Sequence, residues 1–290
     1  MVDLSLKQLR LFCSVARTGN LGITAEQLFL TRGAVSQGIK ALESRLGVSL
    51  FERQAQRLHL NARGHLLLPL AQQMLNRQEN ILALFEPGGS QAPLRLGASL
   101  TIGNYLLPTL LGGEFGGIPL DGEIRLANSA EIQRALVAYQ LDLGLIESEI
   151  LEPGLERRHW RDDEMVMIAP VDHPLSGKVA DWERLSEETW VLRERQSGSR
   201  EQFDRYLGPR LKPVIRTLEL GSLEAVVRSV QAGLGCALVS RLACDDGLAR
   251  RVVSQVELPE PIYRRLYLVW GEGNRALPQV ASALKLLSPR

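Results

Sequence analysis

The chain has 290 residues, which is long enough for two domains or more. Its hydrophobic content of 45% and charged content of 23% are those of an ordinary soluble globular protein. No apolar run approaches the roughly 18 residues that a membrane span needs. The N-terminus MVDLSLKQLR also lacks the apolar core of a secretory signal. These features argue against a membrane partner and predict a cytoplasmic protein.

The net charge of +1 hides an uneven distribution of charge along the chain. Residues 1–65 carry nine basic and four acidic side chains, a net charge of +5, which leaves −4 for the remaining residues. A basic N-terminal segment on a mildly acidic body is typical of a nucleic-acid-binding module fused to a part that does not bind nucleic acid.

The three cysteines, Cys13, Cys236 and Cys244, form neither a CxxC pair nor a disulfide framework. This usage is consistent with a reducing compartment. We expect Cys13 and Cys236 to behave as buried small hydrophobic side chains. A redox switch between Cys236 and Cys244 stays an alternative, although no basic residue flanks either thiol to stabilise a thiolate.

Two helices are predicted before residue 30. Ser5 and Gln8 form a capping-box signature for the first helix, which should end near Gly19. Asn20 is the candidate cap of a shorter second helix, and a tight turn at Phe29-Leu30 follows it. The side chains expected to face inward are Leu9, Phe12, Cys13 and Ala16 in the first helix and Ile23, Ala25 and Leu28 in the second.

A third helix, from Thr31 to Leu46, should have two contrasting faces, with Thr31 as its N-cap. Its core face would carry Val35, Ile39, Leu42 and Leu46. Its opposite face is rich in hydrogen-bonding groups, namely Arg32, Gly33, Ser36, Gln37 and Lys40. Two helices joined by a tight turn, the second with such a face, predict a helix-turn-helix that reads base edges in the major groove. The alternative, a surface helix that only meets water, stays open because periodicity cannot detect a groove.

The next segments predict a wing and a long helix. Residues 48–60 should form a two-stranded wing whose Arg53 and Arg57 reach DNA phosphates. Asn61 should cap a helix from Ala62 to about Phe85. Its apolar stripe, which the small N-terminal domain cannot cover, is Leu67, Leu70, Met74, Ile81 and Leu84. A second copy of the chain could cover it, which would place two recognition helices on one two-fold axis facing a palindromic site.

Residues 1–61 are thus expected to form the DNA-binding domain, 62–86 the dimerisation helix and 87–93 a hinge linker within the segment EPGGSQAP. From residue 94 on, alternating strands and helices predict an α/β effector domain with a parallel sheet and two lobes. The first lobe would span about 94–162 and 268–290, and the second about 163–267. Strands are expected at 94–98, 124–127, 141–146, 166–169, 190–192, 215–218, 236–239 and 265–270, and helices at 102–111, 130–139, 200–207, 223–232 and 279–287.

Ligands of such sheets bind outside the carboxyl ends of the strands, where helix N-termini point. Hydroxyls, glycine N–H groups and one arginine at these positions predict a cleft for a small anion. Capping alone is the alternative for any one of them, because Ser, Thr and Asn commonly cap helices. The candidates are Ser99, Thr101, Asn128, Ser129 and Glu147 from the first lobe, and Gln196, Ser197, Gly198, Ser199, Arg200, Gly221 and Ser222 from the second.

Motifs of other function classes are weak. The sequence contains no GxSxG, GxxxxGK[ST] or HExxH, and its four histidines lack metal-ligand spacing with any cysteine. The run Asp162-Asp163-Glu164 is interpreted as an acidic turn between strands rather than a cation site. We therefore expect no catalytic residues, no cofactor and no bound metal.

Several of these segments resemble the LysR-type transcriptional regulators. The motifs are LKQLRLFCSVARTGN, AVSQGIKALESRLGVSLFER and RLHLNARG, and the order of the domains matches over the whole chain. The resemblance implies a homo-oligomer, usually a tetramer, with a periplasmic-binding-protein-like effector domain that alters DNA contacts, and RNA polymerase as a partner. Carried over by position, Thr31, Arg32, Gly33, Ser36, Gln37 and Lys40 would face DNA, with Arg53, Arg57 and Asn61 on its backbone.

The chain departs from the family where Thr31-Arg32-Gly33 replaces the common Ser-Gln-Pro, which puts the target sequence in doubt more than the fold. Within the family, GASLTIGNYLLP, LGLIE, RERQSGSRE and ELGSLEAVVRSVQAGLG resemble the branch of CysL, YeiE and the carbon-fixation regulators. That resemblance implies a sulphur oxyanion such as sulphite as effector. The alternatives are a transport-type solute-binding protein and, less favoured, an enzyme on the same two-lobed fold.

Overall fold

The structure is a computed structural model that describes residues 4–54, 57–85, 92–113, 115, 118, 120, 124–212 and 216–288. These residues form two compact units, one built mainly from residues before 93 and one built mainly from residues after it. The predicted linker at 86–93 lies almost entirely outside the described residues, as do Ala55 and Gln56 at the tip of the wing.

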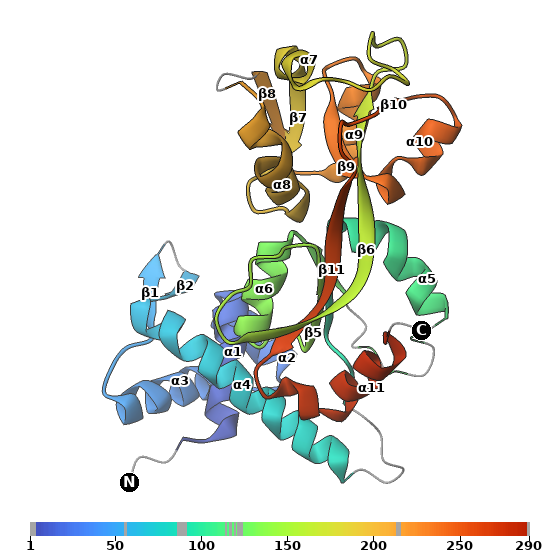
Figure 1. Ribbon diagram of the computed structural model, residues 1–290. Helices are drawn as coiled ribbons and strands as arrows, with labels where there is room; N and C mark the ends of the chain where they lie inside the picture. Colours follow the sequence, from blue (N-terminus) through green and yellow to red (C-terminus); the bar gives the residue numbers. More distant parts are fainter. Residues whose placement is uncertain are drawn as a thin grey trace. The chain divides into compact units, whose positions relative to one another are not determined.

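The N-terminal unit contains the predicted three helices, wing and long helix, so the winged helix-turn-helix is confirmed (Figure 1). The predicted caps Ser5, Asn20, Thr31 and Asn61 all accept hydrogen bonds from backbone N–H groups in the first turns of their helices. The elements are α1 (Leu6–Thr18), α2 (Leu21–Gln27), α3 (Arg32–Leu46), β1 (Phe51–Gln54), β2 (Arg57–Leu60) and α4 (Ala62–Leu84).

One core joins the helices of this unit, and its centre includes Phe12, Val15, Val35 and Leu42. The predicted inward position of Ile23 is wrong, because this side chain is 46% exposed. The buried position in α2 belongs to Thr24 instead, whose hydroxyl forms a 2.8 Å hydrogen bond with that of Thr18. The other two predicted inward residues, Ala25 and Leu28, do pack in or against the core.

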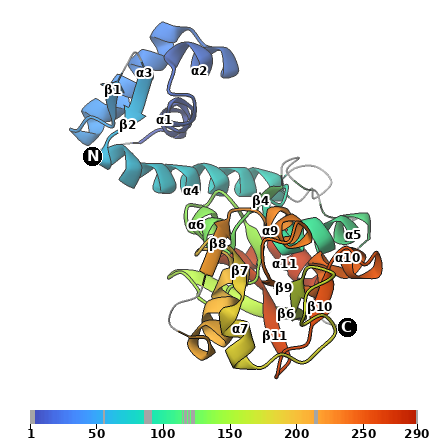
Figure 2. The same ribbon diagram turned by 90° about the horizontal axis from the view of Figure 1, so that it is seen from above.

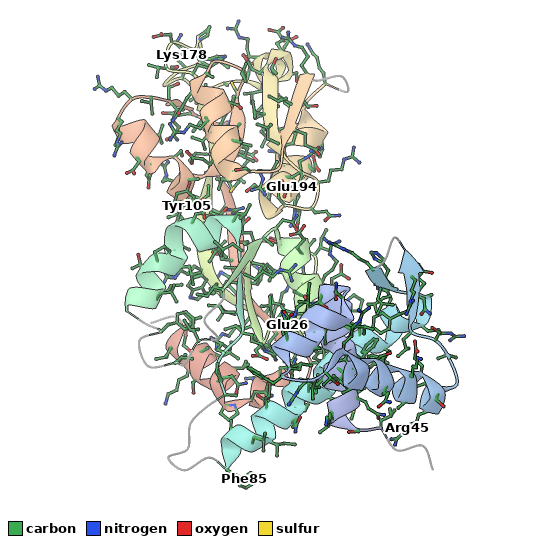
Figure 3. All side chains as sticks on the ribbon, turned by 180° about the vertical axis from the view of Figure 1, so that it is seen from behind. Glu26, Arg45, Phe85, Tyr105, Lys178 and Glu194 are labelled. Atoms are coloured by element: carbon green, nitrogen blue, oxygen red, sulfur yellow. The ribbon has the colours of Figure 1, made fainter. Side chains whose placement is uncertain are left out.

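Helix α4 begins against the wing and continues as one long helix (Figure 2). A Cβ atom added to Gly64 would lie 2.3 Å from the Leu50 carbonyl oxygen, so only glycine allows this close start. Farther along, the stripe expected to be uncovered is exposed at Leu70, Met74 and Ile81. Phe85, just beyond the end of the helix, is also exposed (Figure 3).

The C-terminal unit is a two-lobed α/β domain, as predicted (Figure 1). Its strands are β3 (Leu96–Ser99), β4 (Arg125–Ala127), β5 (Leu143–Ile146), β6 (Leu155–Ala169), β7 (Thr189–Arg193), β8 (Arg216–Leu220), β9 (Ala237–Ser240), β10 (Ser254–Val256) and β11 (Ile262–Gly271). Its helices are α5 (Leu107–Gly112), α6 (Ser129–Val137), α7 (Trp182–Glu187), α8 (Gly198–Gln202), α9 (Leu223–Gln231), α10 (Asp245–Ala249) and α11 (Pro278–Leu286). Helices α5 and α8 are joined to the π-helical turns η1 (Ile102–Leu106) and η2 (Phe203–Leu207), and short 3-10 turns are η3 (Gly208–Arg210), η4 (Arg241–Ala243) and η5 (Asn274–Ala276).

The predicted βαβαβ unit is confirmed, because β3 pairs in parallel with both β4 and β5. The final strand returns to this sheet as expected, and β11 runs antiparallel between β5 and β6. The sheet is therefore mixed rather than purely parallel. Strands β7 and β8 form a separate parallel pair in the second lobe. Helices α7 and α10 and strand β10 were not predicted.

The largest difference concerns β6, of which only residues 166–169 were predicted as a strand. The strand has 15 residues and pairs with β11 from Met165 opposite Ile262 to Leu155 opposite Gly271. The interpretation of Asp162-Asp163-Glu164 as a turn is wrong, because these residues lie inside the strand. The sequence pattern did not indicate the first part of β6, because one of its inward positions is occupied by a buried carboxylate, Asp163, rather than by an apolar side chain.

Strands β6 and β11 run side by side from one lobe to the other (Figure 1). The first lobe packs on both sides of β3 and β5, and the second lobe packs around β7 and β9. The lobes also meet through Tyr105 of η1, which contacts the apolar cluster of the second lobe (Figure 3). In the described part of the chain, no helix has the length and apolar character needed to cross a membrane.

Candidate functional site

The outer face of α3 presents the residues expected to face DNA. Arg32, Gly33, Gln37 and Lys40 are exposed, and Ser36 is half-buried. Thr31 begins the helix, and its Oγ1 accepts a 3.1 Å hydrogen bond from the N–H of Ala34. The face thus offers guanidinium, amide and ammonium donors without a carboxylate among them, which suits contact with base edges and phosphates.

The wing adds two exposed arginines, Arg53 in β1 and Arg57 in β2. Asn61 joins the wing to α4, because its Nδ2 donates to the Ser49 carbonyl oxygen at 2.8 Å and its Oδ1 accepts from the Gly64 N–H at 2.9 Å. Both ends of the Asn61 amide are engaged in these contacts. Asn61 therefore has a structural role in addition to the contact with the DNA backbone that the resemblance implies.

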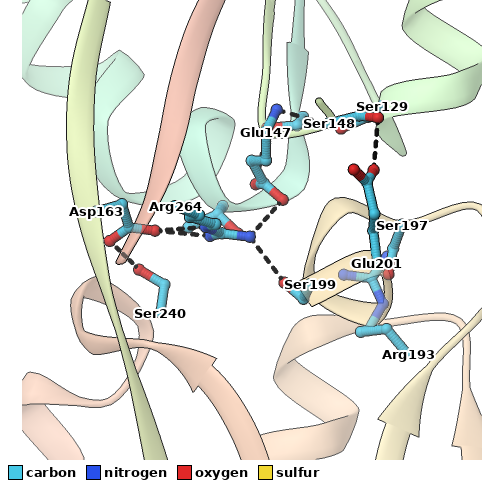
Figure 4. A network of polar contacts seen from close by, with 12 residues as sticks. Ser129, Glu147, Ser148, Asp163, Arg193, Ser197, Ser199, Glu201, Ser240 and Arg264 are labelled. Atoms are coloured by element: carbon cyan, nitrogen blue, oxygen red, sulfur yellow. Dashed lines mark hydrogen bonds and ion pairs between the residues drawn. The ribbon is translucent and has the colours of Figure 1, made fainter. Parts of the chain in front are cut away.

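A buried arginine, Arg264, lies between the two lobes of the effector domain (Figure 4). Its Nε donates to Asp163 Oδ2 at 2.8 Å, and Asp163 is its direct partner in the pairing of β6 with β11. Its Nη1 donates to Glu147 Oε2 at 2.9 Å and to Ser199 Oγ at 3.1 Å. Its Nη2 donates to Thr101 Oγ1 at 3.2 Å and contacts Asp163 Oδ2 at 2.7 Å. We call these residues, with Ser99 and Ser240, the interlobe cluster.

The interlobe cluster joins the lobes through charge-assisted hydrogen bonds. Thr101 and Glu147 belong to the first lobe, whereas Ser199 belongs to the second. Asp163 extends the network, because its Oδ1 accepts a 2.8 Å hydrogen bond from Ser240 at the end of β9. Arg264 is only 1% exposed, and its pKa is raised because the attraction of Glu147 and Asp163 outweighs the opposing effect of burial.

Glu147 is the acceptor at the centre of the cluster. Its Oε1 accepts a 2.8 Å hydrogen bond from Ser99 Oγ, and Gly198 packs directly against it. A Cβ atom at Gly198 would lie 2.6 Å from Glu147 Cβ, so the second lobe can approach this closely only with glycine there. Burial raises the pKa of Glu147, but Arg264 and the hydrogen bonds from Thr101 and Ser99 lower it further, so that the net shift is downward.

The structure thus brings together five of the predicted effector residues, namely Ser99, Thr101, Glu147, Gly198 and Ser199. Two others adjoin them. Ser129 Oγ accepts from the N–H of Glu147 at 3.3 Å, and Ser197 caps α8 through the N–H of Arg200 at 3.1 Å.

The remaining predicted residues lie outside the cluster. Asn128 and Gln196 form hydrogen bonds between the lobes, to Glu194 at 3.3 Å and to Arg134 at 3.1 Å. The Arg200 side chain forms ion pairs with Asp204 and Glu219. Gly221 and Ser222 are exposed, and Ser222 caps α9. Of these last three residues, Ser222 has the capping role that was the alternative.

A cavity of about 710 Å³ opens between the lobes beside the cluster. Ser148 and Ser197, the direct neighbours of Glu147 and Gly198, line it. Ser148 Oγ donates to Glu201 Oε2 across the lobes at 2.6 Å. The residues of the interlobe cluster themselves do not line this cavity, whereas the predicted Gln196 and Ser197 do.

Sequence reasoning missed Arg264, Asp163, Ser240 and Gln202. One signal for Arg264 was present, since the alternation Ile262, Arg264, Leu266 places it on the inward face of a strand. Gln202 in α8 is fully buried, and among the described residues neither polar atom of its amide has a hydrogen-bond partner. Such a group stabilises a site only when a polar ligand or water contacts it.

Among the described residues, one group has the side-chain types of a metal site: His173, Glu188 and Cys236, whose ligand atoms lie within 4.8 Å of one another. Their hydrogen bonds account for the arrangement without an ion. His173 Nδ1 accepts from the Leu175 N–H at 3.3 Å, which places the ring proton on Nε2, where it faces Glu188 at 3.1 Å. Burial raises the pKa of Cys236 to about 12, so its thiol is protonated.

The fold and these two sites define a class of protein: a DNA-binding module joined to a two-lobed sensor domain. Residues 6–65 match the family model described as bacterial regulatory helix-turn-helix protein, lysR family. Residues 87–289 match the model of the LysR substrate binding domain. The chain belongs to the LysR family of transcriptional regulators, whose members bind DNA and respond to small effectors.

Named relatives agree with the expected branch of the family. The chain is 34% identical over 273 residues to the uncharacterized HTH-type transcriptional regulator YeiE of Escherichia coli (strain K12), covering 93% of this chain and 91% of that one. It is 33% identical over 285 residues to the RuBisCO operon transcriptional regulator of Allochromatium vinosum, covering 96% and 93%.

Solved structures share the fold. A full-length OxyR variant from Pseudomonas aeruginosa superposes with a TM-score of 0.78 at 26% identity, covering 98% of this chain and 93% of that one. The CcmR regulatory domain of Synechocystis PCC6803, solved in complex with 2-PG, superposes with a TM-score of 0.61 at 28% identity, covering 67% of this chain and 95% of that one.

Proposed function

We propose that this chain is a sequence-specific transcriptional regulator that reads DNA with the outer face of α3. Arg32, Gln37 and Ser36 would contact base edges, while Lys40 would contact phosphates beside Thr31 and Gly33 at the start of the helix. Arg53 and Arg57 in the wing and Asn61 beside it would hold the DNA backbone. The observation that carries this proposal is the exposed, carboxylate-free donor face of α3 within a basic domain.

Two copies of the chain would bind together through α4. Leu70, Met74 and Ile81 form an exposed apolar stripe there, and a second α4 would remove it from water. Pairing gives the two recognition helices the two-fold symmetry that a palindromic operator requires. We place the chain in the cytoplasm, as a homotetramer that contacts RNA polymerase and has no catalytic activity.

The effector would be a small anion bound between the lobes at the interlobe cluster. Ser99, Thr101 and Ser199 offer hydroxyls, and Arg264 supplies the positive charge that such a ligand needs. The similar CcmR domain binds 2-PG, which supports a small ligand in a domain of this fold. A sulphur oxyanion such as sulphite is the specific candidate, suggested by the resemblance to YeiE and its branch.

Selection of bound fragments from random genomic DNA tests the regulatory proposal. Recovered fragments should share a palindromic sequence, and their affinity should fall steeply with salt. The same measurement with added sulphite should change the affinity or the length of DNA that the chain protects. Absence of salt-sensitive DNA binding would remove the regulator and favour the solute-binding alternative.

A further inference from the structure

Phe29, in the turn between α2 and α3, is 96% exposed, more than any other large apolar residue in the described part of the chain. Its neighbours Leu28 and Leu30 both pack against the core of the N-terminal unit. Because the side chains on either side face inward, the ring of Phe29 points away from the core. The folded unit therefore gains no burial of apolar surface from this ring.

The backbone at Phe29 is also unfavourable for this residue type. Its φ of 53° lies in the left-handed region, where a side chain crowds the carbonyl oxygen that follows it. The N–H groups of Phe29 and Leu30 donate to the carbonyl oxygens of Glu26 at 3.3 Å and Ala25 at 2.9 Å. This pair of bonds closes α2 with a motif that usually has glycine at the position of Phe29. Neither the backbone nor the core explains a phenylalanine here.

The position of Phe29 relative to α3 suggests what the ring does. It lies two residues before Thr31, and Thr31, Arg32 and Gly33 are all exposed. In a helix-turn-helix the first residues of the second helix contact base edges, while the helix before it crosses the DNA backbone. The turn between the two helices then lies against the DNA. In the major groove thymine presents a C5-methyl group, which a phenylalanine ring can contact.

We propose that Phe29 contacts the methyl group of a thymine beside the bases read by Arg32, and so adds a base preference at one position of each half-site. The ring leaves water only in the complex with DNA, which is why the free chain shows it exposed. This inference rests on the DNA-reading function proposed above. It adds a residue that determines specificity and the base that this residue selects.

Operator fragments recovered by the selection from random genomic DNA are the probe. Replacing one thymine at a time by uracil removes only the methyl group, and fluorescence anisotropy measures the affinity. At the position that Phe29 contacts, uracil should weaken binding of the wild-type chain about fourfold for each half-site, the factor expected when one methyl group is no longer buried. Uracil at that position should change the affinity of Phe29→Gly and Phe29→Ala by less than about twofold, because the ring is gone.

Two further variants serve as controls. Phe29→Tyr keeps an aromatic ring and should keep the sensitivity to uracil. Val48→Ala removes another exposed apolar side chain of the same unit, beyond the opposite end of α3, and should also leave the sensitivity unchanged. Phe29→Gly should melt at no lower temperature than the wild-type chain, since glycine adopts this φ without strain. A loss of DNA contact in this variant then does not reflect unfolding.

Two results would overturn the thymine contact while leaving a DNA-binding regulator in place. One is a wild-type chain that is insensitive to uracil at every position. The other is a Phe29→Gly variant that keeps the wild-type sensitivity, even if it binds all DNA more weakly, because that pattern would place the ring on the sugar–phosphate backbone. If the fragments bound by the wild-type chain share no sequence, the proposed regulator itself fails, which is a separate result.

Discussion

Replacement of Arg264 by methionine tests whether the interlobe cluster holds the effector domain together. Methionine fills a similar volume, but Glu147 and Asp163 lose the guanidinium that contacts both of them. Removing one partner of a buried ion pair destabilises a protein by about 3–5 kcal/mol. Arg264 serves two carboxylates and its side chain has 0% exposure, so we expect a loss at the upper end of that range, about 5 kcal/mol.

Urea unfolding followed by tryptophan fluorescence measures this loss in the full chain. All four tryptophans, residues 160, 182, 190 and 270, lie in the effector domain, so the signal reports on that domain alone. The control is Arg228→Met in α9, whose ion pair with Glu224 is exposed at both ends. Exposed pairs of this kind contribute about 0.3–0.5 kcal/mol.

The pH dependence of the free energy of unfolding gives a second check on the same variant. In the wild-type chain the pKa of Glu147 is lowered on folding, so its stabilising contribution is present above the unfolded pKa and is lost as the pH falls. Without Arg264, the two carboxylates have no positive partner, which favours their protonation. Lowering the pH should therefore destabilise the variant less than it destabilises the wild-type chain. The stability difference between the two chains should therefore shrink on acidification. A loss below about 1 kcal/mol that does not change with pH would refute the reasoning.

Three further outcomes are expected. Arg32→Ala should lower the preference for operator over random DNA by about 1–3 kcal/mol, whereas Arg57→Ala should weaken binding to all DNA and reduce the salt slope by about one, as fluorescence anisotropy over a salt series would measure; equal effects of both on specific and random DNA would contradict this division. Ile81→Lys should raise the dimer dissociation constant at least about tenfold in analytical ultracentrifugation, and an unchanged constant would place the contact elsewhere. Cys236 and Cys244 should resist alkylation in the native chain near neutral pH, because burial raises the pKa of each thiol to about 12, and rapid labelling of either would restore the redox alternative.

The N-terminal unit could be predicted closely because its signals are local. Cap residues such as Ser5 and Thr31 lie next to the turns they stabilise, and the apolar repeat of α3 fixes which face is buried. The position of Ile23 is the exception. Thr24 is buried and bonded to Thr18, and Ala25 packs in the core, so the neighbouring Ile23 points to solvent.

The candidate effector site could be predicted only in part, because its centre depends on pairing between strands far apart in the sequence. Ser99, Glu147 and Ser199 were found from their positions at strand ends and helix starts. Asp163 and Arg264 meet because β6 pairs with β11 about a hundred residues later. Alternation along β11 marks Arg264 as inward, but no local rule pairs it with Asp163, and the polar run around Asp163 favours a turn instead.

The position of Arg264 also constrains how a ligand could act on the lobes. Its contacts come from the first lobe through Thr101 and Glu147 and from the second through Ser199, and Arg264 itself lies on a strand that runs through both. A ligand shifts a conformational equilibrium only by its difference in affinity between the two states. An anion that bound Arg264 and residues of both lobes would favour the arrangement of the lobes in which all of those contacts form. A ligand that binds only in the cavity beside Ser148 leaves the contacts of Arg264 unchanged. Such a ligand could shift the equilibrium between arrangements of the lobes only through the contacts of Glu201.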